Sequence, residues 1–208
     1  IIITYNVKKF LIQCIKSILF HTNTKFNYEI IVVDNNSSDN TKKEVRKKYP
    51  SINYIKNLKN FGFSKALNQA INESRGKYIF QLNPDTEFVE DSISKMHDYI
   101  SNNNKLVILG PKIINESGKV QQSHWETPTL FYTILNLSNL QFIINLFKKI
   151  KNPIKPIKVD TISGAAMFYE ASIIKKVGVF NENLFWDEDI DFCIRAEKKG
   201  YNIIFFPQ

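Results

Sequence analysis

The chain has 208 residues, of which 43% are hydrophobic and 23% charged, and this composition predicts one medium-sized globular domain with a sizeable core. Its formal net charge of +8 favours polyanionic partners, but the lysines are dispersed and accompany no nucleic-acid motif, so we expect no nucleic acid among them. The 7 glycines exclude an extensive glycine-rich phosphate loop, and neither a signal peptide nor an uninterrupted apolar stretch of about 18 residues is present.

Strand-like and helix-like segments alternate through the first half of the chain. Short apolar runs predict buried strands, and apolar residues at helical spacing predict helices between them. The expected strands cover residues 1–4, 29–34, 52–55 and 77–82, and the expected helices cover residues 7–19, 41–49 and 63–71. This order predicts an α/β fold with a mostly parallel sheet and helices on both of its faces.

The second half of the chain is less regular. Its expected elements are a hairpin around residues 115–118, a loop at 151–158, a strand at 159–170, a helix at 190–199 and a strand at 201–206. Cys14 and Cys193 lie in apolar helical patterns, which predicts buried free thiols and suits a reducing cytoplasm. An apolar run without methionine opens the chain and another precedes Gln208, so we expect a single domain over residues 1–208 that is truncated at both ends.

Polar side chains stand where the first four strands end. In a parallel sheet these ends meet at one edge, where ligands bind. Asp34 follows the second strand and can accept hydrogen bonds from a ribose or a base, with Ser37 among the polar residues after it. The alternative interpretation is an ordinary turn that caps the next helix.

Asn83, Pro84 and Asp85 follow the fourth strand. Asp85 could bind Mg²⁺ or Mn²⁺, because these cations prefer oxygen ligands and often share substrate phosphates with one or two carboxylates. Such a cation offsets the charge that a departing diphosphate gains. The alternative is a plain turn, for which this tripeptide is well suited.

Four carboxylates lie at or just before the start of the helix expected at 190–199: Asp187, Glu188, Asp189 and Asp191. An ionised member could act as general base toward an acceptor hydroxyl. Helix capping and a metal site are the competing interpretations. Upstream, Gly164 lies in a run of small residues that permits either a close ligand approach or tight core packing.

These motifs, in this order, resemble the family 2 glycosyltransferases of the GT-A fold, and most closely their rhamnosyltransferase-like branch. The matching stretches are residues 1–6 (IIITYN), 31–39 (IVVDNNSSD), 60–64 (NFGFS), 82–86 (LNPDT), 163–167 (SGAAM) and 188–191 (EDID). The resemblance spans nearly the whole chain. Each motif is weak alone, but their common order is specific, and the sequence lacks zinc, serine-elbow, dinucleotide and P-loop motifs.

The resemblance implies a Rossmann-like GT-A sheet, with residues 1–103 as the nucleotide-binding half and residues 104–208 as the acceptor and catalytic half. It implies that Thr4, Asn6, Asp34 and Ser37 hold the base and ribose, and that Asn60, Gly62, Asn68, Asn83 and Gly164 complete the nucleotide-sugar site. Asp85 matches the last acid of the family's D-x-D metal motif. Asn83 replaces the first acid, which leaves one carboxylate for Mg²⁺ or Mn²⁺.

The resemblance also implies an inverting hexosyl transfer in cell-wall or polysaccharide biosynthesis. A dTDP-rhamnose-like donor or a UDP-sugar would supply the sugar, and a hydroxyl of a glycan or lipid-linked acceptor would receive it. Asp189 of the Glu188–Asp189 pair would be the base, with Asp191 as the second choice. The alternatives are a truncated or inactive nucleotide-sugar binding module, and a sugar nucleotidyltransferase. The latter usually carries a glycine-rich basic loop after the first strand, which this sequence lacks.

Residues 129–150 are apolar with interspersed polar residues, and lysines follow them. This pattern predicts either an interfacial helix on an anionic membrane or a flap on the acceptor side. We therefore expect a cytoplasmic protein and, on the first of these interpretations, a peripheral contact at the inner face of the cell membrane.

Overall fold

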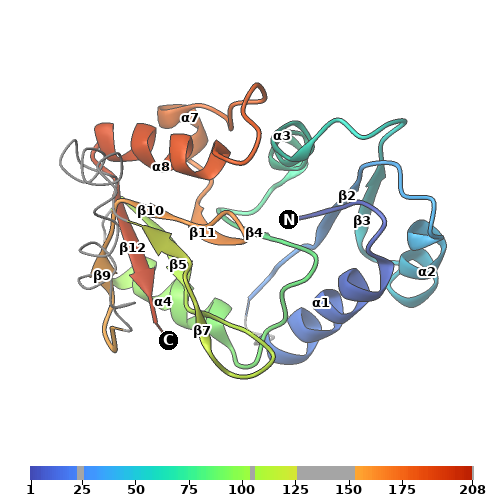
Figure 1. Cartoon of the computed structure of the whole chain (residues 1–208), viewed down its shortest axis with the longest axis horizontal. Helices are drawn as coiled ribbons and strands as arrows, with labels where there is room; N and C mark the ends of the chain where they lie inside the picture. The colour runs from blue at the N-terminus through green and yellow to red at the C-terminus, as the bar shows by residue number, and fades with distance from the viewer. Residues whose placement is uncertain (23–25, 104–105, 126–152, 208) are drawn as a thin grey trace, which may run out of the picture.

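The computed structural model describes residues 1–22, 26–103, 106–125 and 153–207 of the chain (Figure 1). An eight-stranded sheet forms its centre, in the order β3-β2-β1-β4-β11-β5-β12-β9. These strands are β1 (Ile2–Thr4), β2 (Ile31–Asp34), β3 (Asn53–Lys56), β4 (Tyr78–Leu82), β5 (Val107–Pro111), β9 (Ile157–Lys158), β11 (Ala166–Glu170) and β12 (Asn202–Phe206). Two small antiparallel pairs accompany it, β6 (Ile113–Ile114) with β7 (Val120–Gln121), and β8 (His124–Trp125) with β10 (Thr161–Ile162).

The first half of the sheet is parallel, as the alternating pattern predicts. β1 pairs in parallel with both β2 and β4, and β2 pairs in parallel with β3. Every residue of β1 and β2 is buried, because helices cover both faces of these apolar runs. The carboxyl ends of the four strands therefore lie along one edge of the sheet.

The second half is mixed. β11 runs antiparallel between β4 and β5, whereas β12 pairs in parallel with β5. The strand predicted at 159–170 is wrong as one element: it divides into β10 and β11, separated by a turn at residues 163–165. This turn is rich in small residues, and its backbone contacts the helix at residues 188–198. The loop predicted at 151–158 also ends in an edge strand, β9.

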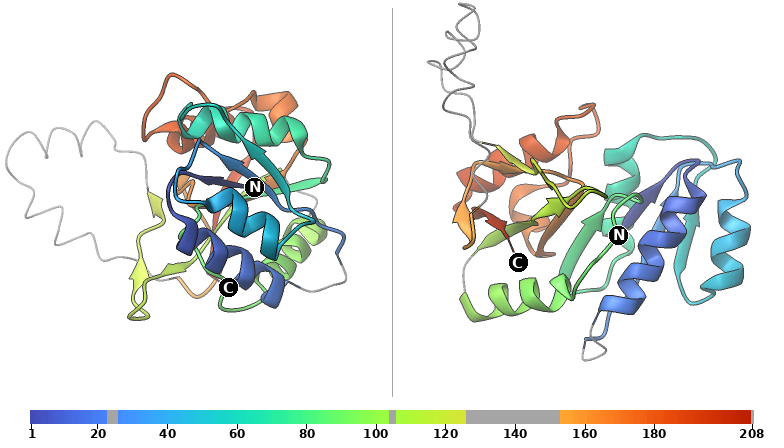
Figure 2. Two further views of the ribbon diagram at one scale, coloured as in Figure 1. Left: turned by 90° about the vertical axis from the view of Figure 1, so that its right-hand side faces the viewer. Right: turned by 60° about the horizontal axis from the view of Figure 1, so that its bottom comes forward.

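Helices cover both faces of the sheet, which confirms the predicted layering (Figures 1 and 2). On one face lie α3 (Phe63–Glu73), α7 (Ile173–Val177) and α8 (Glu188–Lys198), and on the other lie α1 (Lys8–His21), α2 (Thr41–Lys48) and α4 (Ser92–Asn103). The sequence pattern did not predict α7, which has only five residues. Cys14 and Cys193 are free and buried in these layers, as predicted.

No helix within the described part of the chain is long and apolar enough to span a bilayer. The segment 129–150, for which we predict either a membrane contact or a flap, lies outside the described residues.

Candidate active site

The loops after β1 and β2 are bonded to each other. The backbone N–H of Asn6 donates to Ser37 Oγ at 2.9 Å, and the N–H of Ser38 donates to Asn6 Oδ1 at 2.8 Å. Asn6 has a φ of 55°, a left-handed conformation that asparagine tolerates better than most residues. The structure thus brings Thr4, Asn6 and Ser37 to one edge of the sheet.

Asp34 lies beneath these loops and is fully buried, with 0% of its surface exposed. Its Oδ1 accepts a hydrogen bond from the Ser37 N–H at 2.7 Å, and its Oδ2 accepts one from the Tyr54 hydroxyl at 2.6 Å. Burial, followed by the hydrogen bond to Asp34, raises the pKa of Tyr54. Asp34 therefore fixes the shape of the loop from below, and both of its oxygens already have protein partners.

The start of α3 joins the same edge. Asn60 Oδ1 accepts the Gly62 N–H at 2.9 Å, and the Gly62 carbonyl accepts a hydrogen bond from Asn35 Nδ2 at 3.0 Å. Gly62 has a φ of +85°, a conformation that strongly favours glycine. Two hydroxyls here, Thr4 Oγ1 and Ser64 Oγ, are buried without a hydrogen-bond partner among the described residues. The sequence reasoning did not single out Ser64.

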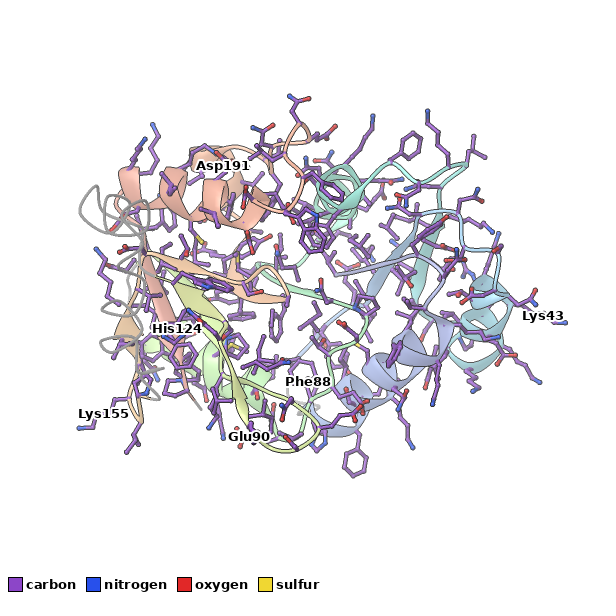
Figure 3. All side chains as sticks on the ribbon, in the orientation of Figure 1. Lys43, Phe88, Glu90, His124, Lys155 and Asp191 are labelled. Atoms are coloured by element: carbon purple, nitrogen blue, oxygen red, sulfur yellow. The ribbon has the colours of Figure 1, made fainter. Side chains whose placement is uncertain are left out.

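Asp85 differs from Asp34 in having an exposed side chain. Within the described chain it makes no hydrogen bond or ion pair, and it lines a cavity of about 410 Å³. Phe88 and Glu90 border the same cavity (Figure 3). A larger cavity, of about 630 Å³, lies at the amino ends of the strands, away from these motifs. The backbone N–H of Asn83 donates to the Ala165 carbonyl at 2.8 Å, so the Asp85 loop is attached to the 163–165 turn.

The same turn holds Asp189. The Gly164 N–H donates to Asp189 Oδ2 at 2.7 Å, and the Ile190 N–H donates to Asp189 Oδ1 at 2.8 Å. Burial raises the pKa of Asp189, and the Gly164 hydrogen bond opposes that rise. Burial, together with the charges of Asp189 and Asp187, also raises the pKa of Glu188. A raised pKa makes an ionised carboxylate a stronger base, which suits it to accept a proton.

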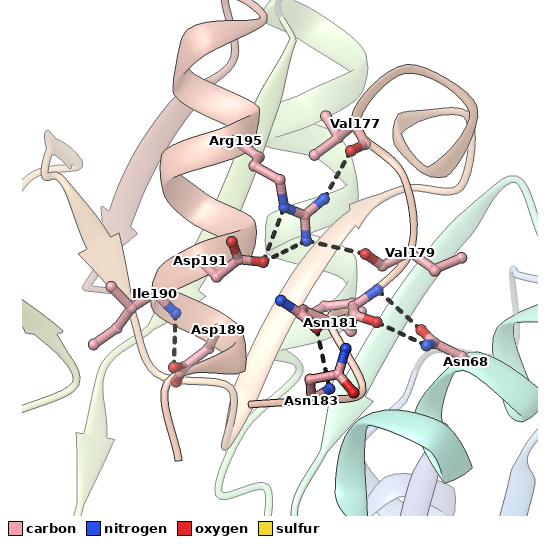
Figure 4. Close-up of polar contacts among 10 residues, drawn as sticks. Asn68, Val177, Val179, Asn181, Asn183, Asp189, Ile190, Asp191 and Arg195 are labelled. Atoms are coloured by element: carbon pink, nitrogen blue, oxygen red, sulfur yellow. Dashed lines mark hydrogen bonds and ion pairs between the residues drawn. The ribbon is translucent and has the colours of Figure 1, made fainter. Parts of the chain in front are cut away.

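Asp191 has a different environment. Its Oδ2 accepts hydrogen bonds from Arg195 Nε at 2.9 Å and Arg195 Nη2 at 2.7 Å (Figure 4). Arg195 also donates to the carbonyls of Val177 and Val179, at 2.7 and 3.0 Å. The pair therefore fastens α8 to the last residue of α7 and to the loop that follows it.

Asn68 holds the same loop from the other side. Its side-chain amide donates to the Phe180 carbonyl at 2.8 Å, and its Oδ1 accepts a hydrogen bond from the Phe180 N–H at 3.0 Å (Figure 4). The amide also donates to Glu182 Oε1 at 3.0 Å. The family resemblance placed Asn68 near the nucleotide. In the structure its polar atoms connect α3 to the segment that leads into the acidic cluster.

Two aromatic side chains stand exposed immediately before that cluster. Phe185 is 83% exposed and Trp186 is 79% exposed, and their rings meet edge to face at 5.6 Å. Trp186 has a φ of 83°, which is an outlier for so bulky a residue. Backbone strain of this kind concentrates at functional sites.

The described residues contain no group of three or more histidine, cysteine or acidic side chains that could hold a metal ion. A single free carboxylate, Asp85, still fits Mg²⁺ or Mn²⁺, because these cations commonly take most of their ligands from substrate phosphates and water. Such a site is completed by the substrate.

The sequence matches a known protein family and individual members of it. The model of the family described as glycosyl transferase family 2 matches residues 1–178. The low-salt glycan biosynthesis hexosyltransferase Agl10 of Haloferax volcanii is 31% identical over 84% of this chain and 55% of its own length. The N-acetylglucosaminyl-diphospho-decaprenol L-rhamnosyltransferase of Mycobacterium tuberculosis is 25% identical over 86% of this chain and 64% of its own length. The chain thus spans less than two thirds of these relatives.

Solved structures share the fold at low sequence identity. TarS 1-349 of S. aureus in complex with UDP superposes with a TM-score of 0.68 at 18% identity, and the match covers 100% of this chain and 59% of that one. GalNAc-T7 with UDP, GalNAc and Mn²⁺ gives a TM-score of 0.73 at 15% identity, over 99% of this chain and 41% of that one. The predicted GT-A fold is confirmed by these neighbours.

Proposed function

The chain belongs to glycosyl transferase family 2, and on that premise we propose that it transfers a sugar, with inversion, from a nucleotide-diphosphate donor to a hydroxyl of a glycan or lipid-linked acceptor. One observation carries the proposal. The 163–165 turn accepts a hydrogen bond from the N–H of Asn83, two residues before Asp85, and it donates a hydrogen bond from the Gly164 N–H to Asp189. It thereby connects the carboxylate proposed for the donor phosphates to the carboxylate proposed as base.

Asp189 acts as the base in this proposal. Its carboxylate takes the proton of an acceptor hydroxyl as that oxygen attacks the anomeric carbon. The bond from that carbon to the donor diphosphate breaks on the opposite side, so a single displacement inverts the configuration. Asp189 suits this role better than Asp191, because Asp191 is already paired with Arg195. Glu188 shares the cluster and contributes to its charge.

The donor side is proposed to lie in residues 1–103. Thr4 supports it, because its buried hydroxyl has no partner in the described structure and can bond a base or ribose. We propose that Asn60, Gly62, Asn83 and Gly164 complete the nucleotide-sugar site. Asn6, Asp34 and Ser37 act mainly by holding this edge in shape. The TarS complex contains UDP, which favours a pyrimidine nucleotide such as UDP or dTDP.

Asp85 would hold Mg²⁺ or Mn²⁺ against the donor phosphates. The bound cation would neutralise the charge that gathers on the departing diphosphate. The GalNAc-T7 neighbour, which contains Mn²⁺, supports the class of cation but not its identity.

The acceptor side is proposed to lie in residues 104–208, next to Asp189. Phe185 and Trp186 are exposed there, and their rings can pack against the apolar face of a sugar. One relative, the L-rhamnosyltransferase of Mycobacterium tuberculosis, is named for N-acetylglucosaminyl-diphospho-decaprenol, which is a lipid-linked sugar. We extend this to a cytoplasmic site of action, with residues 129–150 contacting the inner face of the membrane.

A thermal-shift screen with UDP-, GDP- and dTDP-sugars, each with Mn²⁺ or Mg²⁺, tests the proposal. A ligand that binds only the folded chain at 100 times its dissociation constant stabilises it by about 2.7 kcal/mol. We expect one nucleotide class to raise Tm in the presence of cation, and slow release of free sugar from that donor. No shift with any donor would contradict the proposal. A shift without turnover, even when glycan acceptors are added, would favour a binding module.

A further inference from the structure

Two buried polar side chains lie behind the proposed base. Gln81, on β4, is 1% exposed, and Tyr169, on β11, is 0% exposed. The Tyr169 hydroxyl donates to Gln81 Oε1 at 3.2 Å, and Gln81 Nε2 donates to the Gly164 carbonyl at 3.1 Å. The N–H of the same Gly164 bonds Asp189. A continuous chain of hydrogen bonds therefore runs from the sheet to the base.

We propose that Gln81 and Tyr169 are positioning residues that fix the 163–165 turn and, through the Gly164 N–H, the carboxylate of Asp189. The inference rests on the proposed role of Asp189 as base. It adds two residues that touch neither donor nor acceptor.

The packing around Gly164 leaves the turn little freedom. A Cβ on Gly164 would lie 3.3 Å from both Asp189 Cβ and Gln81 Nε2, so only glycine lets the turn approach this closely without displacing them. Gln81 suits its place because an amide donates and accepts at once. Tyr169 also touches α8 directly, with its ring centroid 5.7 Å from that of Phe192. The network thus supports both the turn and the helix that carries Asp189.

The network also bears on the charge of the base. The charged or titratable groups that act on Asp189 are Asp187 and Glu188 beside it and the Cys193 thiol one turn along α8. β4 and the 163–165 turn contribute neutral groups, namely Gln81 and backbone. A hydrogen bond to a carboxylate favours its ionised form. Losing the Gly164 N–H would therefore raise the pKa of Asp189 further.

The test compares Gln81→Met with Tyr201→Phe, a control at another buried position, in the full chain. Tyr201 is buried like Tyr169, but within the described structure its hydroxyl has no hydrogen-bond partner. The Asp189 carboxyl is followed by ¹³C NMR during a pH titration, and its signal is assigned by its loss in Asp189→Asn. We expect Gln81→Met to raise that pKa by about 0.5 to 1 unit, the equivalent of one hydrogen bond. Tyr201→Phe should leave it unchanged.

Turnover gives a second readout once a donor is known. Misplacing a catalytic group by about 1 Å can cost about 100-fold, so Gln81→Met should lower kcat by about 10-fold to 100-fold while the donor KM stays near that of the parent chain. Gln81→Glu is the conservative rescue. Burial keeps this glutamate protonated, so it can replace both hydrogen bonds and should restore most of the loss.

The inference is overturned if Gln81→Met matches Tyr201→Phe in both the titration and kcat, or if Gln81→Glu is as impaired as Gln81→Met. If Gln81→Met does not fold, Tyr169→Phe takes its place. It removes one hydroxyl and should lower kcat by about 2-fold to 10-fold, whereas equality with Tyr201→Phe would contradict the inference. The NMR titration needs no substrate, so it still decides the role of the network if sugar transfer itself is not found.

Discussion

The two ends of the proposed site differ in how their polar groups are used. At the ends of β1 and β2, Asp34, Asn6 and Ser37 are bonded to other parts of the protein. Near the 163–165 turn, Asp85 has no hydrogen bond or ion pair within the described chain, and Asp189 has only backbone N–H donors. We call these the bonded region and the open region. The difference separates residues that build the site from residues available to a ligand.

The difference between the two regions has an energetic consequence. Removing a group from the bonded region leaves buried partners unpaired, which lowers stability. Removing Asp85 leaves no such partner unpaired, and Asp189→Asn keeps an oxygen for the Gly164 N–H, so losses in the open region should appear mainly in binding or turnover. Mutations can therefore test whether the division is real.

The largest effect is expected for Asp189→Asn. The variant keeps a carbonyl oxygen for the Gly164 N–H but cannot accept the acceptor's proton. Turnover should fall by about 100-fold to 10,000-fold, while the donor affinity measured by calorimetry stays close to that of the parent chain. Normal turnover would show that another group is the base.

The stability of Asp189→Asn should also depend on pH. Burial raises the pKa of Asp189, so the folded state binds its proton more tightly than the unfolded state does. Stability from this group is thus present at low pH and is lost as pH rises through the raised pKa. At neutral pH the neutral asparagine avoids that loss, but it offers one oxygen to the two N–H groups that Asp189 accepts, so Tm should change by no more than about 4 °C. For the same reason the acid limb of kcat/KM in the parent chain should lie above the ordinary range of aspartate.

Asp85→Ala should have the next largest effect. Losing the free carboxylate should weaken cation-dependent nucleotide binding by about 10-fold to 100-fold, as for a hydrogen-bonded charge, with little change in Tm. Glu87→Ala is the matched control, because Glu87 is exposed and lines the same cavity. Equal affinity in Asp85→Ala and Glu87→Ala, titrated with and without Mn²⁺, would remove Asp85 from the metal site.

Much of this site follows from the sequence because its signals are local. An apolar strand that ends on a carboxylate is visible in a few residues, and this placed Asp34 and Asp85 at one edge. The partners of these groups are distant in sequence and carry no local signal. Asn68, for example, bonds Phe180, 112 residues away. Gln81 does carry a local signal, because its amide side chain interrupts the otherwise apolar and aromatic strand β4.

The split of the strand predicted at 159–170 has a similar cause. Small residues there fit both a continuous strand and a turn. The choice depends on Gln81 and Asp189, which bond the turn from other parts of the chain. Sequence periodicity cannot register such contacts, because it describes only neighbours along the chain.

Tyr54→Phe tests the bonded region. It removes the hydroxyl that donates to Asp34 Oδ2 and leaves a buried carboxylate oxygen without that partner. The free energy of unfolding, measured in urea, should fall by about 1 to 3 kcal/mol. Tyr201→Phe, which removes a hydroxyl without a partner among the described residues, should cost less. If nucleotide affinity fell while stability held, Tyr54 would belong with the ligand-facing groups instead.

The smallest effect, at Trp186, should have opposite signs in stability and function. Its φ of 83° costs a residue with a side chain about 1 to 2 kcal/mol relative to glycine, so Trp186→Gly should raise Tm by a few degrees. Trp186→Ala keeps that backbone strain and loses the same ring. If the ring packs on the acceptor, both variants should raise the acceptor KM by about 2-fold to 10-fold and leave donor affinity alone. Suppose that only Trp186→Gly has a higher Tm and that both variants lose acceptor binding equally. The backbone strain would then be retained because the Trp186 ring binds the acceptor. Unchanged acceptor KM in both variants would place Trp186 outside the site.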